Sequence, residues 1–244
     1  MKNLFSWQIM RQSFKSAWIW WAIIIGVSAL NFFALPTMFE SDADSSQLLN
    51  LFIDVGILGN GIIFATIFVV ILGNALITSE IDRGTLAITL NTPTTRRQIL
   101  FSKGLVLIGA LVTIPLAIGA IGSISPILFG LDFDHAKWWT ITGLWFMYTF
   151  LMGGIAFFIA CWFNKSRYTL SATALILGAF FLLAMLSTIN DFEFLRFFTL
   201  QTLFDIDAVL NGNSVIWQYI VMPIIAIPLY VAGVVKFLKK DLPI

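Results

Sequence analysis

Long apolar runs alternate with shorter polar segments along the chain, and the runs have the length of membrane-spanning helices. A helix rises about 1.5 Å per residue and needs about 20 apolar residues to cross about 30 Å of hydrocarbon. Six runs that lack Asp, Glu, Lys and Arg reach roughly this length: Trp18–Pro36, Ile57–Thr78, Gly104–Phe129, Trp139–Phe163, Tyr168–Ile189 and Val215–Val235. Backbone polar groups in hydrocarbon must bond within their own segment, so we predict an all-α membrane protein with six transmembrane helices.

The composition agrees with this pattern. Of the 244 residues, 59% are hydrophobic and 11% are charged, against about half and a quarter in soluble domains. No polar block is large enough to fold alone, so we predict one membrane domain over residues 1–244. The net charge of +1, with dispersed Lys and Arg, excludes a nucleic-acid-binding face. A single cysteine, Cys161, permits no internal disulfide.

The basic residues predict the orientation of the chain, because cytoplasmic flanks carry an excess of Lys and Arg. One set of flanks and loops holds Lys2, Arg11, Lys15, Arg83, Arg96, Arg97, Lys103, Lys165, Arg167, Lys236, Lys239 and Lys240. The other set holds only Lys137 and Arg196. We therefore expect a multi-pass protein of the cell membrane with both termini in the cytoplasm.

Residues 1–17 precede the first apolar run and have an amphipathic pattern. Trp7, Met10 and Phe14 recur at helical spacing, while Arg11 and Lys15 point elsewhere. This pattern favours a helix that lies in the cytoplasmic interface and contacts membrane lipid. The alternative is a solvated leader.

The polar segment over residues 79–103 is the most informative part of the sequence. Leu86 and Leu90 give a short helix an apolar side, and Pro93 ends that helix because proline lacks an N–H and disfavours a helical residue before it. Thr95 and Gln98 have the spacing of a capping box. We therefore predict a second helix that begins at Arg96 and runs through Lys103 into the third span.

The same segment resembles the permeases of type 2 ABC exporters. The pattern E-x-x-x-G-T…L-x-x-P-x-x-R…K of those proteins is matched by Glu80, Gly84, Thr85, Leu90, Pro93, Arg96 and Lys103. The resemblance implies a cytoplasmic coupling helix that docks on a separate ATP-binding subunit, present in two copies, and a dimeric permease. The residues that it assigns to coupling are Glu80, Asp82, Arg83, Gly84, Thr85, Leu90, Pro93, Arg96, Arg97 and Lys103.

Without the family resemblance, each of these residues has more than one possible role. Gly84 can allow close backbone approach or take a positive φ. Glu80 can pair with a basic residue of this chain or of a partner. Arg96, Arg97 and Lys103 either take part in coupling or only anchor the chain on its positive side.

No catalytic chemistry is visible in the sequence. The chain has no G-x-x-x-x-G-K-[ST] phosphate loop, so we expect no cofactor here and expect a partner to bind ATP and Mg²⁺. His135, beside Asp132 and Asp134, belongs either to a cation site or to a solvated turn, and we predict no metal site and no enzyme activity. Three intramembrane amides, Asn31, Asn60 and Asn74, are candidates for a sodium site or for interhelical hydrogen bonds.

Residues 190–213 are too apolar for a free loop and too charged for a span. We predict short helices that re-enter the outer leaflet, with Phe194, Phe197, Phe198 and Phe204 forming either an external gate or an aromatic interface belt. For a cargo pathway the available lining is apolar: Phe32, Phe33, Phe64 and Phe68. The alternative for these four side chains is helix packing or lipid contact.

The leading hypothesis is the membrane subunit of an ATP-driven exporter that works as a homodimer. Its expected cargo is amphipathic or hydrophobic: a peptide, toxin or antibiotic. A different class would be a non-transporting immunity or assembly protein that binds peptide partners. An ion-coupled secondary transporter is disfavoured, since the predicted spans lack the buried ionisable residues of a relay.

Overall fold

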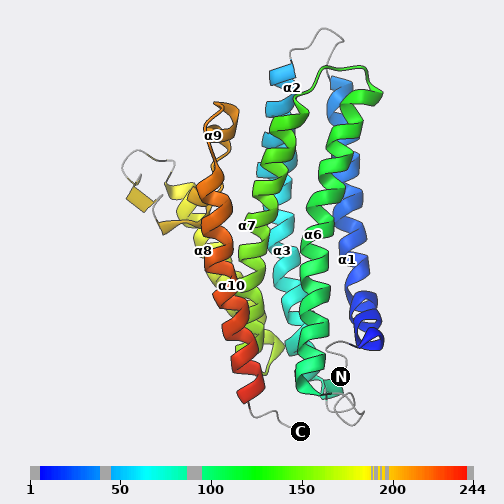
Figure 1. Ribbon diagram of the computed structural model, residues 1–244, viewed down its shortest axis with the longest axis vertical. Coiled ribbons are helices and arrows are strands. Elements are labelled where there is room, and N and C mark those ends of the chain that lie inside the picture. Colours follow the sequence, from blue (N-terminus) through cyan, green and yellow to red (C-terminus); the bar gives the residue numbers. More distant parts are fainter. Residues whose placement is uncertain are drawn as a thin grey trace.

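The protein is a bundle of antiparallel helices. The computed structural model describes the chain except residues 1–5, 39–44, 87–94, 188, 190, 191, 193, 196, 197 and 241–244. All regular structure in this described part is helical, and six helices are long and apolar enough to cross a membrane. The start of the first helix and the end of the last lie at the same end of the bundle, as an even number of crossings requires (Figure 1).

The first span is part of a longer helix. Helix α1 (Trp7–Ala34) is continuous over 28 residues and leads into a 3₁₀ turn, η1 (Leu35–Met38). The part of this run that is long and apolar enough to cross a membrane is Trp18–Met38, which begins where predicted. Residues 7–17 are helical and continuous with it, and their position in the cytoplasmic interface stays a prediction. No glycine or proline lies between Trp7 and Trp18 to interrupt the backbone hydrogen bonds.

The second span is a single helical run that starts at Ser45, not at the predicted Ile57, and ends at Asp82. Its parts are α2 (Ser45–Leu51), the π-helix η2 (Phe52–Gly61), α3 (Ile62–Gly73), the π-helix η3 (Asn74–Thr78) and α4 (Ser79–Asp82). Asp54, predicted to lie in a loop, is inside the run on its exposed side. An exposed carboxylate at this position does not stop the helix.

The third span, α6 (Arg96–Leu128), begins where the capping pattern predicts. The Thr95 amide donates to Gln98 Oε1 over 2.9 Å, and the Gln98 amide donates to Thr95 Oγ1 over 3.3 Å. These reciprocal bonds satisfy two of the amides that the first turn of a helix leaves unpaired. The predicted capping box is confirmed.

The fourth span, α7 (His135–Trp162), is the centre of the bundle. It contacts α3, α6, α8 and α10, and Trp138, Trp145 and Tyr148 on it are fully buried. The apolar stretch of α7 is 72% buried, against 22% for those of α1, α8 and α10. The three outer spans therefore keep large apolar faces for lipid or for another protein.

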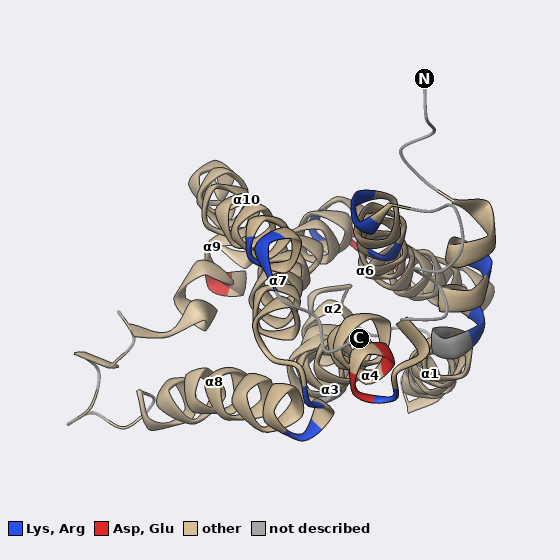
Figure 2. Ribbon diagram, turned by 90° about the horizontal axis from the view of Figure 1, so that it is seen from below, with Lys and Arg blue, Asp and Glu red and all other residues tan. Residues whose placement is uncertain are grey.

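The fifth and sixth spans are connected by residues 190–213, called the external segment after the side on which the sequence predicts it. Helix α8 (Ser166–Leu186) leans away from α10 (Ile216–Lys239), and α9 (Ile206–Leu210) lies beyond the start of α10 (Figures 1 and 2). A 3₁₀ turn, η5 (Leu200–Leu203), precedes α9. Short helices are thus present between the fifth and sixth spans, and their entry into the outer leaflet stays a prediction.

Small residues let the spans approach closely. A Cβ atom on Gly73 would lie 3.2 Å from the Ala156 Cβ, and one on Gly119 would lie 2.9 Å from both Thr142 and Trp139. These contacts hold the second and third spans against α7.

Candidate functional site

The candidate site is the end of the second span, at α4, together with the first turns of α6. This end of the bundle also holds the start of α1 and the end of α10, and Figure 2 looks directly onto it. The π-helix η3 comes immediately before α4. π-helical turns are rare and are frequent at functional sites, and η3 is one of the two π-helical stretches of this span.

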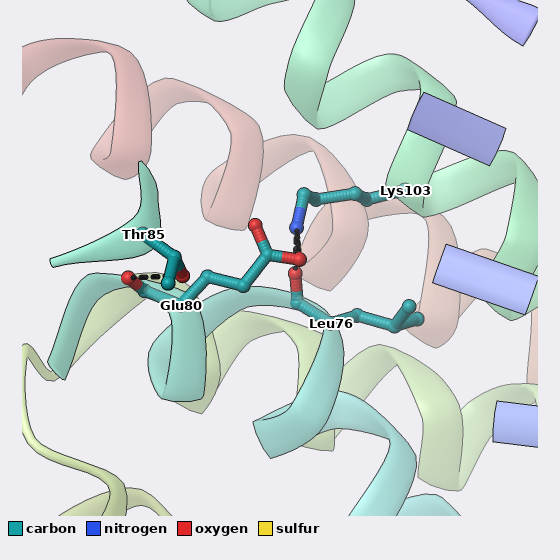
Figure 3. Close-up of polar contacts among 4 residues, drawn as sticks. All are labelled: Leu76, Glu80, Thr85 and Lys103. Atoms are coloured by element: carbon teal, nitrogen blue, oxygen red, sulfur yellow. Dashed lines mark hydrogen bonds and ion pairs between the residues drawn. The ribbon is translucent and has the colours of Figure 1, made fainter. Parts of the chain in front are cut away.

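Glu80 and Lys103 form an ion pair across the site. Glu80 Oε1 lies 2.5 Å from Lys103 Nζ, and the same ammonium donates a hydrogen bond to the Leu76 carbonyl oxygen over 2.5 Å (Figure 3). The Lys103 side chain is 3% exposed and that of Glu80 is 21% exposed. Burial of an ammonium is tolerated only with such partners, because desolvation of an unpaired charge is costly.

The ion pair settles one alternative that the sequence left open. Glu80 pairs with a basic residue of its own chain, and that residue is Lys103. Lys103 is accordingly not a solvated anchor. Because the pair joins the last turns of the second span to α6, it fastens together the two ends of the polar segment 79–103.

Gly84 forms the turn that ends the second span. Its φ is +71°, in the left-handed region that favours glycine, and a Cβ atom there would meet nothing within 4 Å. The Arg83 amide donates to the Ser79 carbonyl and the Gly84 amide to the Ile81 carbonyl, each over 3.1 Å. The residue is therefore required for its backbone conformation, as at many helix C-termini, and not for close approach.

Thr85 follows this turn and bonds back to it. Its hydroxyl donates to the Glu80 carbonyl oxygen over 3.2 Å (Figure 3). This bond satisfies a carbonyl that the end of the helix would otherwise leave open. The Glu80–Gly84–Thr85 pattern thus corresponds to one folded turn.

Asp82 connects the second span to the fifth. Its Oδ2 accepts a hydrogen bond over 3.1 Å from the amide of Ser166, the first residue of α8. A carboxylate is favourable at a helix N-terminus, where the amides are unpaired and the dipole is positive. Asp82 therefore acts as an N-cap supplied from a distant part of the chain.

Thr78 connects the second span to both α7 and α8. Its buried hydroxyl donates to the Ala160 carbonyl oxygen over 3.0 Å and accepts a hydrogen bond from the Thr169 hydroxyl, also over 3.0 Å. Thr78 and Asp82 are four residues apart and so lie on one side of the helix, whereas Glu80 faces α6. The end of the second span is thus bonded to three other spans.

Arg96 takes part in a separate cluster at the same end. Its Nη1 donates to the Lys240 carbonyl oxygen over 3.1 Å, and Lys240 Nζ donates to the carbonyl oxygens of Cys161 and Phe163 over 3.1 and 2.6 Å. The Lys240 amine thereby caps the C-terminus of α7. Desolvation by burial, reinforced by the charge of Lys236, lowers the pKa of Lys240 to about 8, although the nearby Cys161 thiol opposes this shift.

The structure brings half of the predicted coupling residues together. Glu80, Asp82, Gly84, Thr85 and Lys103 surround the end of α4. Arg96 lies in the Lys240 cluster, and Arg83 and Arg97 are exposed, without an ion pair to any residue that the structure describes. The predicted short helix falls largely on residues 87–94, so Leu90 and Pro93 lie outside the described residues.

Sequence reasoning missed Thr78, Thr169 and Lys240. Thr78 is at the end of one apolar run and Thr169 is near the start of another, and neither has a distinguishing local pattern. Lys240 was counted only for its charge. Their partners are between 77 and 91 residues away in the chain, so no spacing rule could have found them.

The predicted pathway residues are mainly core residues. Phe32 is fully buried, with its ring 5.1 Å from that of Phe52 and 5.4 Å from that of Trp138, centroid to centroid. Phe68 is also buried, and Phe64 is half-buried. Only Phe33, on another face of α1, is exposed. Packing, the alternative interpretation, accounts for Phe32 and Phe68, because their rings fill space between spans of one chain.

The predicted gate residues do not gather at one place. Phe204 is buried and stacks on Tyr148 of α7, with ring centroids 5.5 Å apart. Phe194 and Phe198 are exposed, and Phe197 lies outside the described residues. Phe204 therefore anchors the 190–213 segment to α7.

The remaining polar candidates have local roles where the structure describes them. Asn31 Nδ2 donates to a backbone carbonyl of its own helix over 2.9 Å, so it forms no bond between helices there. Asn74 is buried with its Oδ1 unpartnered, and the side chain of Asn60 lies outside the described part. Asp134 caps α7 through the Lys137 amide over 3.0 Å, and no cluster of His, Cys, Asp or Glu suited to a metal occurs among the described residues.

Comparison with known proteins decides the family. Residues 10–242 match the family model described as ABC-2 family transporter protein. The chain belongs to this family. It is therefore the membrane permease of an ABC transporter, and ATP is hydrolysed by a partner subunit, not by this chain. No curated protein and no solved structure matches the permease.

Proposed function

We propose that the permease couples ATP hydrolysis by its partner to export through the 79–103 segment. The observation that carries the proposal is the set of bonds at the end of the second span: Glu80 to α6, Thr78 to α7 and α8, and Asp82 to α8. A partner that displaces this segment would move several spans together. The termini and this segment are then cytoplasmic, as the basic residues predict.

The turn at Arg83 and Gly84 is the accessible part of this site. Both residues are exposed, and Arg83 has no ion pair among the described residues. An exposed guanidinium on a rigid turn is suited to bidentate contact with carboxylates of an ATP-binding subunit. We propose that Leu90 and Pro93 complete the contact as the coupling helix.

The apolar faces of the outer spans support a dimeric permease with two ATP-binding subunits. Leu30 on α1 and Leu175 on α8 are 73% and 72% exposed. Lipid covers part of such surfaces, and a second copy of this chain would cover the rest. The cargo pathway would then lie between the two copies, with exposed Phe33 a better candidate for its lining than buried Phe32.

An apolar pathway favours an amphipathic or hydrophobic cargo, and we propose a peptide, toxin or antibiotic. The external segment would close this pathway on the outer side. The stacking of Phe204 on Tyr148 supports that role, since it fixes one end of the segment to α7 and leaves Phe194 and Phe198 exposed.

Purification with the ATP-binding subunit tests the proposal. The complex is reconstituted in lipid, and ATP hydrolysis and ATP-dependent transport of an amphipathic peptide are measured for Glu80→Gln and Gly84→Ala. We expect assembled complexes that hydrolyse ATP with little transport. Lys165→Gln is the control, because Lys165 is an exposed basic residue at the same end outside the segment. Normal assembly and transport in both variants would refute the coupling site.

A further inference from the structure

A groove runs between the first half of α1 and the middle of α6, apart from the coupling site. Its volume is about 480 Å³, and its walls include Trp7, Phe14 and Trp21 of α1 and Leu105 and Gly109 of α6. Trp7, Phe14 and Leu105 are exposed. The groove therefore opens outward from the bundle, on helices that cross the membrane.

The polar groups of the groove are paired, with one exception. Trp21 Nε1 donates to Thr113 Oγ1 over 2.9 Å, and that hydroxyl donates to the Gly109 carbonyl over 2.8 Å. Arg11 lies in the groove wall near the start of α1 and forms no ion pair with any described residue. Lys15 adds a second positive charge one helical turn away.

We propose that this groove binds an anionic phospholipid, with an acyl chain along α6 and the phosphate on Arg11. Between Leu105 and Thr113 the groove follows α6 for on the order of 12 Å by helical rise, enough for much of an acyl chain. A guanidinium takes a phosphate bidentately. Trp7, exposed and one helical turn from Arg11, is a residue type typical of the headgroup level of a membrane.

The charge distribution selects an anionic lipid. A zwitterionic headgroup carries its own cation, which competes with Arg11 and Lys15 for the phosphate. An anionic headgroup leaves both basic residues to be neutralised by the lipid. A basic residue near an anionic surface contributes about 1 kcal/mol, or about fivefold in affinity.

The test uses the full chain in vesicles of equal phosphatidylglycerol and phosphatidylcholine, followed by gentle extraction and native mass spectrometry of the bound lipid. The wild-type protein is expected to retain phosphatidylglycerol preferentially. Arg11→Gln should lower that preference about fivefold, and Arg11→Lys should lower it less. Gly109→Phe should lower the amount of bound lipid, because its side chain would enter the open groove.

Two variants control for charge and for bulk. Lys137→Gln removes a basic residue at the opposite end of the bundle, and Gly178→Phe adds the same ring at another helical glycine with free space around it. Both should retain lipid as the wild type does. Equal retention of the two lipids by the wild type, or unchanged retention in Arg11→Gln and Gly109→Phe, would overturn the proposal. The proposal would also be overturned if Gly109→Phe kept its bound lipid and instead lost its association with a second copy of the chain.

Discussion

The Glu80 carboxylate lies 2.5 Å from the Lys103 ammonium, and these two residues bound the polar segment between the second and third spans. The segment is thus a loop whose base is closed by an ion pair. Asp82 and Thr78 extend the base to α8 and α7. In the proposed coupling, a movement of this segment would therefore be transmitted to a group of spans through these bonds.

Removal of one member of this pair should destabilise the permease. Glu80→Ala leaves the buried Lys103 ammonium with the Leu76 carbonyl as its described partner, and we expect a loss of about 3 kcal/mol in the free energy of unfolding. Unfolding in a detergent titration measures this loss. The Glu80→Ala/Lys103→Met double variant should lose less than the sum of the single variants.

The Asp134–Lys137 ion pair is the matched control for these Glu80 and Lys103 variants. Its charged atoms are 3.6 Å apart and both side chains are more than one-third exposed. Lys137→Met should change the free energy of unfolding by no more than about 1 kcal/mol. A loss as large as that of Glu80→Ala would contradict the importance that we give to burial of the Glu80–Lys103 pair.

Substitution of Gly84 and Gly178 by alanine should have opposite effects. Gly84→Ala places a Cβ atom on a residue with φ of +71°, at a cost of about 1–2 kcal/mol. Gly178→Ala, inside α8 with free space around it, should stabilise by about 0.5–1 kcal/mol. Thermal unfolding of the two variants measures the difference. A neutral Gly84→Ala would show that the turn is not held as described.

The Thr78–Thr169 hydrogen bond should be visible as an energetic coupling. Thr78→Val keeps the shape of the side chain but removes both hydroxyl bonds, and we expect a loss of about 1 kcal/mol. Thr169→Val in the Thr78→Val background should cost little more. Thr140→Val, whose hydroxyl bonds within its own helix, provides the control. Additive losses at Thr78 and Thr169 would contradict the coupling.

The Lys240 amine should titrate below the ordinary pKa of a lysine side chain. Burial lowers its pKa to about 8, so the folded protein binds fewer protons there than the unfolded chain at pH values between about 8 and about 10.5. Its contribution to stability therefore rises with pH across this window. Brief acylation at pH 8 followed by peptide mapping should label Lys240 more readily than exposed Lys239. A labelling midpoint near 10.5 would refute the shift.

Features that depend on neighbouring residues were predictable from the sequence. The six apolar runs and the Thr95–Gln98 capping box depend on local composition and spacing, and they correspond to observed helices. The start of the second span was missed because Asp54 does not end a helix when it lies on an exposed side. The two π-helical turns of this span have no recognised sequence pattern.

Features that depend on tertiary packing were not predictable. Phe32 and Phe33 are adjacent in sequence, yet one is in the core and the other is exposed. Thr78 and Thr140 are alike in type, but the Thr78 hydroxyl bonds to another span and the Thr140 hydroxyl bonds within its own helix. Asp82 caps α8 through the amide of Ser166, which is 84 residues away in the chain. Each distinction depends on which helix lies alongside, and single-sequence spacing does not contain that information.

The most direct test of the account measures the distance between α6 and α8 as the partner hydrolyses ATP. Spin labels at Leu116→Cys and Leu175→Cys would occupy exposed sites on the two helices, and native Cys161 is buried. Dilution with unlabelled chain gives one labelled copy per complex. Vanadate trapping of the nucleotide should shift the distance in the wild type, whereas Glu80→Gln/Asp82→Ala should abolish the shift in an assembled complex. The same shift in both proteins would contradict coupling through the 79–103 segment.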